Sequence, residues 1–305
     1  RKIHDGDGGR MFVDQTDGQT VYGTYVQSNL YLSTDGGSTW ENSPMGFGDN
    51  MLSRTPISSE NVPFYLEYDV NSKATGQVLL VGSTHVYLAT GGLQTPNAIS
   101  AITGTGSPNK TVGTPQCAQF GAGGEIFVGT RSKNVYVSTD QGATFTKATF
   151  SAGVPSCFAT DASDNYTYMT TKTVGNAFGG SFFRSADTGK TWTQPANLNL
   201  PTTVNYYTMA ANDQAVFVGS DYGVLYSTDR GESWHNTDVL GFPHAQVTSL
   251  KIRGHYVLAT TYGRGMYYLD LTKLAGAVAP EHATAAPTFS LTAVYPDPIP
   301  SAVPM

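Results

Sequence analysis

The chain has 305 residues, of which 13% are charged, and a formal net charge of −6. Its 17 lysine and arginine residues are scattered singly, which argues against nucleic acid binding because such sites need clustered positive charge. No apolar stretch is long enough to span a bilayer, and no His and Cys spacing is typical of a metal site. We therefore expect no membrane span, no metal and no cofactor.

Four segments of the chain align without gaps on the pattern S-x-D-x-G-x-[ST]-[WF]. They are Ser33–Trp40, Ser138–Phe145, Ser185–Trp192 and Ser227–Trp234. Their aspartates are 105, 47 and 42 residues apart, so the first interval lacks one unit, which is present in degenerate form at Val86–Gly92. Serine and aspartate can hydrogen-bond within a hairpin, and the glycine permits a positive φ. Four copies of one pattern indicate a scaffold element rather than a catalytic group.

Short apolar runs that end in a small pair lie upstream of these motifs, and one more follows the last motif. They are Thr20–Thr24, Val78–Ser83, Ile126–Thr130, Val216–Ser220 and Tyr256–Thr261. Such runs, separated by turn residues, predict antiparallel strands. Repeats of about forty residues with four strands each are typical of a propeller. We predict an all-β propeller with six recognisable four-stranded blades and with the motif hairpin between the third and fourth strands.

The two ends of the repeat array leave two alternatives open. The sixth unit has three strands and no motif, so either Arg1–Asp7 supplies its outer strand and closes the ring, or a seventh blade precedes the chain. We predict a propeller over residues 1–274 and a tail or linker over residues 275–305, because the composition there shifts to Pro and Ala. This tail is a candidate for self-assembly or tethering.

Cys117 and Cys157 lie in matching contexts, Thr-Pro-Gln-Cys and Val-Pro-Ser-Cys, and so occupy equivalent positions in neighbouring repeats. Two buried free thiols are the favoured interpretation, and a disulfide between adjacent inner strands is the alternative. The chain begins with Arg1, which indicates a processed product or a fragment. Low lysine content and sequons at Asn109 and Asn165 favour an extracellular location.

The four motifs, the opening Asp5–Gly9 and the closing Tyr262–Leu269 resemble the Asp-box (BNR) repeat propellers of secreted bacterial proteins. That group is similar to sialidases, to sortilin-type receptors and to tandem-propeller xyloglucanases. The resemblance extends to about residue 272 and implies the fold, whereas one fold carries many activities. In such relatives the opening motif often follows another propeller, so the chain resembles the C-terminal half of a larger protein.

The resemblance also implies where a site lies. Turns between second and third strands and connections between blades share one face of a propeller, opposite the Asp-box hairpins, and related enzymes carry their site on that first face. The residues that we predict for binding there are Arg54, His85, Arg131, Asp221, Tyr222, Tyr262 and Arg264, with Lys133 beside them. The two tyrosines, at matching positions beside glycines, are candidates for stacking on sugar rings.

A glycoside hydrolase needs two carboxylates that flank the scissile bond. The available candidates are Asp5, Asp7 and Asp49, although an acidic turn that accepts backbone hydrogen bonds is the commoner role. The sequence does not match the three arginines and the tyrosine–glutamate pair that a sialidase requires. The leading hypothesis is a secreted or cell-surface binding or structural module for glycan or protein partners. The alternative is a xyloglucanase-like hydrolase, as half of a tandem-propeller enzyme, so enzymatic activity stays open.

Overall fold

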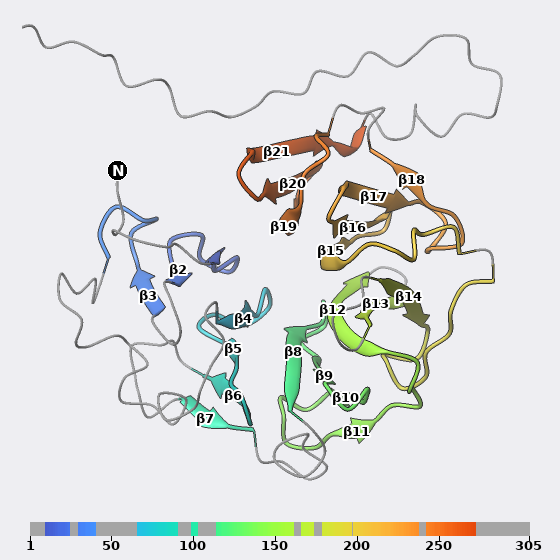
Figure 1. The fold of residues 1–305 in the computed structure, drawn as a ribbon. Coiled ribbons are helices and arrows are strands. Elements are labelled where there is room, and N and C mark those ends of the chain that lie inside the picture. The colour runs from blue at the N-terminus through green and yellow to red at the C-terminus, as the bar shows by residue number, and fades with distance from the viewer. Residues whose placement is uncertain are drawn as a thin grey trace, which may run out of the picture.

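The computed structural model describes residues 10–24, 30–40, 66–90, 99–102, 114–161, 166–173, 179–196, 198–237 and 242–272. In these ranges the chain forms six antiparallel sheets, and consecutive strands pair as neighbours within each sheet. The sheets follow one another around a central axis in chain order (Figure 1). The structure therefore confirms an all-β propeller with six recognisable blades.

Three blades hold three strands each within the described residues. Blade one contains β1 (Met11–Val13), β2 (Val21–Thr24) and β3 (Leu30–Ser33). Blade four contains β12 (Val154–Asp161), β13 (Tyr166–Lys172) and β14 (Gly180–Ser185). Blade six contains β19 (Val247–Arg253), β20 (Tyr256–Thr261) and β21 (Gly265–Asp270).

The other three blades hold four strands each. Blade two contains β4 (Glu67–Val70), β5 (Val78–Val81), β6 (Val86–Ala89) and β7 (Ile99–Ala101). Blade three contains β8 (Pro115–Phe120), β9 (Ile126–Thr130), β10 (Val135–Ser138) and β11 (Thr146–Lys147). Blade five contains β15 (Tyr206–Ala211), β16 (Val216–Ser220), β17 (Gly223–Ser227) and β18 (His235–Asn236).

The fourth strand of blade four is reduced to a single bridge between Arg184 and Thr193. Pro195 follows two residues later, and proline cannot donate a backbone hydrogen bond to a ladder. The outer strand predicted from Arg1–Asp7 and the tail predicted over residues 275–305 lie outside the described residues.

The core lies between neighbouring blades, because each blade buries both of its faces. All four residues of β5 are buried, which explains why the sequence shows a continuous apolar run there instead of an alternating one. Aromatic side chains join one blade to the next. The Phe182 ring of blade four meets the Asp-box Trp234 of blade five edge-on, with their centroids 4.8 Å apart. The aromatic residue of the motif thus packs between blades.

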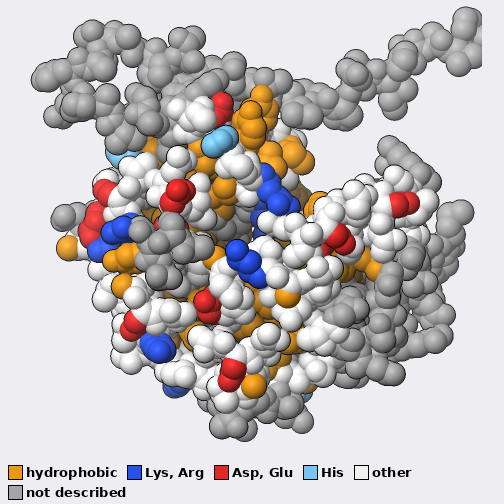
Figure 2. Space-filling model, turned by 180° about the vertical axis from the view of Figure 1, so that it is seen from behind, with side chains coloured by type: hydrophobic (Ala, Val, Ile, Leu, Met, Phe, Trp, Pro, Cys, Tyr) orange, Lys and Arg blue, Asp and Glu red, His pale blue; other side chains and the backbone are white. Residues whose placement is uncertain are grey.

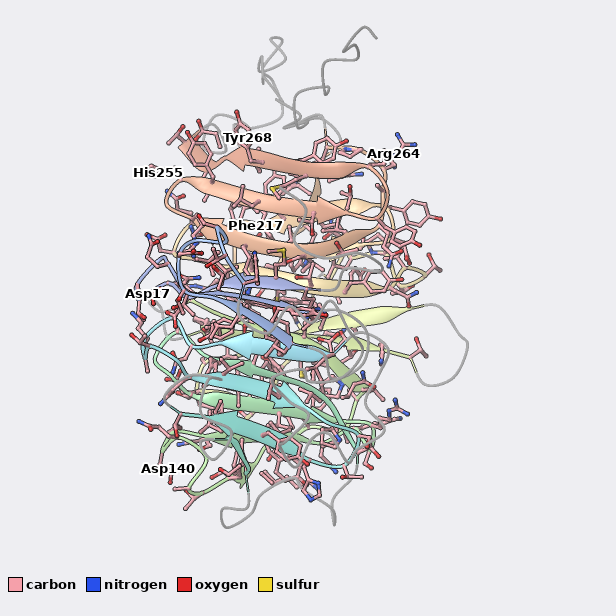
Figure 3. All side chains as sticks on the ribbon, turned by 90° about the vertical axis from the view of Figure 1, so that its left-hand side faces the viewer. Asp17, Asp140, Phe217, His255, Arg264 and Tyr268 are labelled. Carbon is pink, nitrogen blue, oxygen red and sulfur yellow. The ribbon has the colours of Figure 1, made fainter. Side chains whose placement is uncertain are left out.

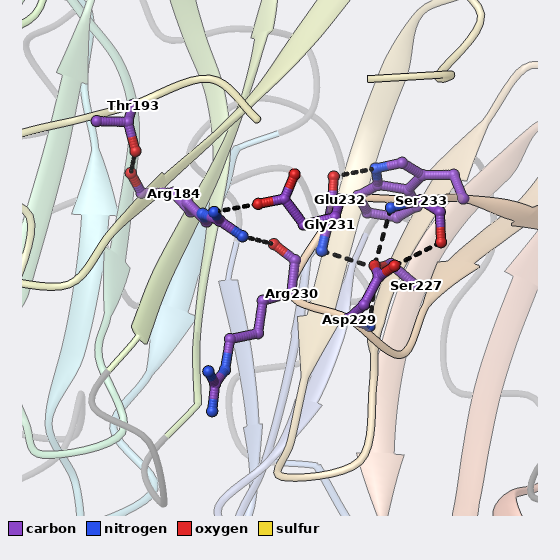
Figure 4. Close-up of polar contacts among 9 residues, drawn as sticks. Arg184, Thr193, Ser227, Asp229, Arg230, Gly231, Glu232 and Ser233 are labelled. Carbon is purple, nitrogen blue, oxygen red and sulfur yellow. Dashed lines mark hydrogen bonds and ion pairs between the residues drawn. The ribbon is translucent and has the colours of Figure 1, made fainter. Parts of the chain in front are cut away.

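The Asp-box hairpins are held by the same hydrogen bonds in all four copies. In blade five, the Ser227 hydroxyl donates to Asp229 Oδ1 at 2.7 Å and accepts from Gly231 N at 2.7 Å (Figure 4). The second oxygen, Asp229 Oδ2, accepts from the Ser233 hydroxyl at 2.5 Å. The other three boxes repeat this pattern. These aspartates satisfy the backbone and hydroxyl donors of a turn, as a scaffold role requires.

The innermost strands satisfy one another's backbone groups across blade boundaries. Asp69 Oδ2 on β4 accepts from Phe120 N on β8 at 2.9 Å, and Thr208 Oγ1 on β15 accepts from Leu250 N on β19 at 3.1 Å. An inner edge strand would otherwise leave donors unpaired at the axis. These bonds fix the inner strands side by side around the ring.

Cys117 and Cys157 follow the same β-bulge in β8 and β12, which places them at equivalent positions. Both thiols are free and buried, so the disulfide alternative is not realised. Burial raises the pKa of both thiols, to about 11 for Cys157, because a thiolate is poorly solvated between packed blades.

Candidate functional site

The Asp-box hairpins and the turns between second and third strands lie on opposite faces of the ring. Figure 3 shows Asp140, in the box of blade three, on one side and Arg264, in the turn between β20 and β21, on the other. We call the side with the boxes the box face and the side with the second-to-third-strand turns the loop face. The predicted division of the propeller into two faces therefore holds.

Each predicted binding residue that the structure describes belongs to a loop-face turn. His85 lies between β5 and β6, where its Nδ1 is 2.8 Å from Thr84 Oγ1. Arg131 opens the turn between β9 and β10, and its backbone N–H donates to Thr114 O at 2.9 Å. Lys133 in the same turn has a φ of 62°. The predicted residues Asp5, Asp7, Asp49 and Arg54 lie outside the described residues.

Asp221 has a positioning role in its turn. Its Oδ1 accepts from the Tyr207 hydroxyl at 2.7 Å, and its Oδ2 accepts from Asn205 N at 2.9 Å. Both carboxylate oxygens therefore tie the turn between β16 and β17 to the segment that begins β15. Sequence reasoning grouped Asp221 with the binding residues, because Tyr207 lies fourteen residues away and gives no local signal.

The two predicted tyrosines occupy equivalent turns of neighbouring blades. Tyr222 is 63% exposed and Tyr262 is 75% exposed, the largest values among the large apolar side chains of the described residues. A glycine with positive φ follows each of them, Gly223 at +114° and Gly263 at +76°. Only a residue without a Cβ adopts such angles readily. The glycine-containing turns of blades five and six thus each expose one tyrosine ring to solvent.

Charged side chains meet near the axis of the ring, and no local sequence pattern predicts their contact. Lys251 on β19 lies 4.2 Å from the ring centre of Phe12 on β1, and its Nζ is 3.8 Å from Asp69 Oδ1 on β4. These contacts connect the last blade to the first two. Burial raises the pKa of Asp69, although Lys251 acts against that shift, and burial lowers the pKa of Lys251.

The box face carries a pocket of about 340 Å³ between blades four and five. Asp161, Tyr168, Asp213, Asp229 and Arg230 are among its lining residues. The Arg230 guanidinium lies 4.9 Å from the ring centre of Tyr166, and its backbone oxygen accepts from Arg184 Nη1 at 3.1 Å (Figure 4). The carboxylate of Asp229 is already occupied by its Asp-box donors. The sequence analysis predicted no binding residue on this face.

Within the described part of the chain, no group of three or more His, Cys, Asp or Glu side chains is placed to hold a metal ion. The same part contains no helix that is long and apolar enough to cross a membrane.

Comparison with known proteins agrees with this architecture. The BNR/Asp-box repeat family matches residues 225–236. No curated protein matches the chain by sequence. Among solved structures, the chain is similar to YCF48 bound to D1 peptide, with 16% identity, a TM-score of 0.55, and coverage of 87% of this chain and 77% of that one.

Two longer proteins contain a similar region. The GH74 xyloglucanase of Xanthomonas campestris gives 17% identity and a TM-score of 0.60, with 92% of this chain and 46% of the enzyme covered. PorZ of Porphyromonas gingivalis, described as a surface component of the type-IX secretion system, gives 14% identity and a TM-score of 0.54, with 88% and 40% covered. At such identities the likeness concerns the fold. The chain is a β-propeller of the Asp-box (BNR) repeat type.

Proposed function

We propose that this propeller is a binding module whose loop face holds a glycan, with Tyr222 and Tyr262 as the residues that stack on sugar rings. One observation carries the proposal: the two most exposed aromatic side chains of the described residues sit in equivalent turns of adjacent blades. A tyrosine combines an apolar ring face with a hydroxyl, which suits a ligand that has apolar ring faces and polar edges.

The rigidity of the two turns supports this use. Tyr222 N donates to Ser220 Oγ at 3.2 Å, and Tyr262 N donates to Gln246 O at 2.8 Å. The Asp221 carboxylate fixes the first turn from the other side. A ring held on an ordered turn loses little conformational freedom when a ligand binds, so more of the contact energy appears as affinity.

The hydrolase alternative is supported only by the fold that the chain shares with the xyloglucanase. It needs two carboxylates about 5 to 10 Å apart on one face. Among the described loop-face carboxylates, Asp221 is engaged by Tyr207 and Asn205, and Glu67 is paired with Arg10 at 2.8 Å. The exposed tyrosines are the observation that favours binding as the proposed function. An extracellular location, and a tail that mediates assembly, accompany this proposal.

Affinity electrophoresis through gels that contain single polysaccharides tests the proposal. We expect retardation by at least one polysaccharide and at least tenfold weaker binding by the Tyr222→Ala/Tyr262→Ala double variant. Tyr256→Ala is the matched control, because Tyr256 is 46% exposed and starts β20 at the other end of blade six. Equal retardation of the double variant and the wild type would refute the assignment.

A reducing-end assay on the same polysaccharides separates binding from hydrolysis. The proposal predicts no release of reducing sugar during prolonged incubation. Sustained release that is lost in Asp5→Ala, Asp7→Ala or Asp49→Ala would favour the hydrolase instead.

A further inference from the structure

Positively charged residues of several blades lie at loop-face strand ends or in loop-face turns. Arg10 precedes β1, and the turn that follows β1 contains Asp17 on the box face, so β1 starts at the loop face (Figure 3). Lys172 ends β13 at the turn to β14, and Arg131 opens the turn after β9. Both turns join second and third strands and therefore belong to the loop face. Arg264 lies on the same face of blade six (Figure 3).

Of these cations, Lys172 and Arg131 are near enough to act on each other. Arg10 pairs with Glu67 at 2.8 Å. Burial lowers the pKa of Lys172, and the neighbouring Arg131 guanidinium lowers it further, while Cys117 and Glu67 act in the opposite direction. Across the ranges that the structure describes, neither Lys172 nor Arg131 forms an ion pair. Glu67 thus acts on both Arg10 and Lys172.

The Asp-box carboxylates lie on the face opposite these turns. The whole chain has a net charge of −6. The four Asp-box carboxylates lie on the box face, where hydrogen bonds keep their pKa low. Figure 2 views this face and shows Asp and Glu side chains spread over it, with several Lys and Arg side chains near its middle. The acidic Asp-box hairpins therefore lie on the face opposite Arg131 and Lys172.

Like charges that are held together cost free energy, and such arrangements occur where a ligand supplies the opposite charge. Guanidinium groups suit carboxylates in particular, because their planar donors match both carboxylate oxygens. The loop face therefore carries both cations, in the turns of blades three and four, and exposed tyrosine rings, in the turns of blades five and six.

We propose that the loop-face cations Arg131 and Lys172 bind the carboxylates of an acidic polysaccharide, which makes a uronic acid polymer the ligand class of the module. This inference rests on the proposed glycan-binding function and specifies its ligand. A polymer of this class presents carboxylates and sugar rings together and so uses both the cations and the tyrosines. An acidic polypeptide offers carboxylates without sugar rings, and the test below includes it.

Calorimetric titration of the full chain with polygalacturonate tests this inference. Highly methyl-esterified polygalacturonate is the neutral counterpart with the same backbone. We expect the Lys172→Gln and Arg131→Gln variants each to bind polygalacturonate at least fivefold more weakly. Lys190→Gln is the matched control, because it removes the same charge from the Asp-box hairpin of the same blade on the opposite face. The control should bind within twofold of the wild type.

The outcomes separate the two proposals. Wild-type binding to the esterified polymer that equals binding to the acid, or an unchanged affinity of Lys172→Gln, overturns the carboxylate inference while glycan binding stands. Equal weakening by Lys190→Gln overturns it as well, because the attraction is then a general charge effect. Tighter binding of polyglutamate than of polygalacturonate replaces the polysaccharide with an acidic polypeptide. The absence of binding to any polysaccharide refutes both proposals.

Discussion

Gly231 of the fifth blade gives the sharpest stability prediction. Its φ is +86°, and a Cβ there would lie 2.1 Å from Phe182 Cε1 and 2.7 Å from Phe182 Cζ. Phe182 is fully buried and packs against Trp234, so it has no free direction in which to move. The left-handed backbone costs an alanine about 1–2 kcal/mol, and overpacking adds about 1–3 kcal/mol. We expect Gly231→Ala to lower the free energy of unfolding by about 2–5 kcal/mol.

Urea unfolding followed by far-UV circular dichroism measures this loss. Gly263→Ala is the matched control, because its φ is +76° but no atom lies within 4 Å of the added Cβ. The control isolates the backbone strain and should lose only about 1–2 kcal/mol. Equal losses in the two variants would refute the packing argument, since the contact with Phe182 is the difference between them.

Three further predictions concern pH, thiols and the join between blades four and five. Hydrogen bonds, first that of the Thr39 hydroxyl, lower the pKa of Asp35 from 3.8 to about 2. The stability that this depressed pKa provides is therefore complete above about pH 5 and is lost as the pH falls through the folded value. Urea titrations at low and neutral pH should show the decline, and a pH-independent stability would contradict it. Cys117 and Cys157 should resist a disulfide reagent at neutral pH until the protein is denatured, whereas fast labelling of the native protein would refute their burial. Arg184 and Glu232 form an ion pair between these blades, with side chains 22% and 40% exposed, so a double-mutant cycle should give a coupling of about 0.2–1 kcal/mol, and zero coupling would deny the link.

The elements that the sequence predicted are those with local signals. The hydrogen bonds of an Asp box join residues within one stretch of eight, Ser227–Trp234 in blade five. The sequence of that stretch is therefore enough to predict its hairpin. The exposed tyrosines follow from the same logic, because a tyrosine before a glycine in a short turn has few places to be buried. The fourth strand of blade four was expected at full length, and the structure shows a single bridge at Thr193, close to Pro195.

The features that the sequence did not predict depend on how the blades are arranged around the axis. Arg10, Arg131 and Lys172 are far apart along the chain, and only the propeller topology brings them to one face. The single, scattered placement of the cations in the sequence argues against nucleic acid binding and does not indicate which face they share. Asp221 is the opposite case, because the sequence predicted it as a binding residue. In the structure its carboxylate accepts a hydrogen bond from Tyr207 and so holds its own turn in place.

Hydrogen exchange in the presence of a bound polysaccharide tests the central claim most directly, because it reports which face the ligand covers. The account predicts slower exchange in the loop-face turns at Tyr222 and Tyr262. It predicts unchanged exchange in the box-face hairpins, such as residues 228–233. Protection confined to the box face, around the pocket between blades four and five, would contradict the account and would move the site to the opposite side of the ring.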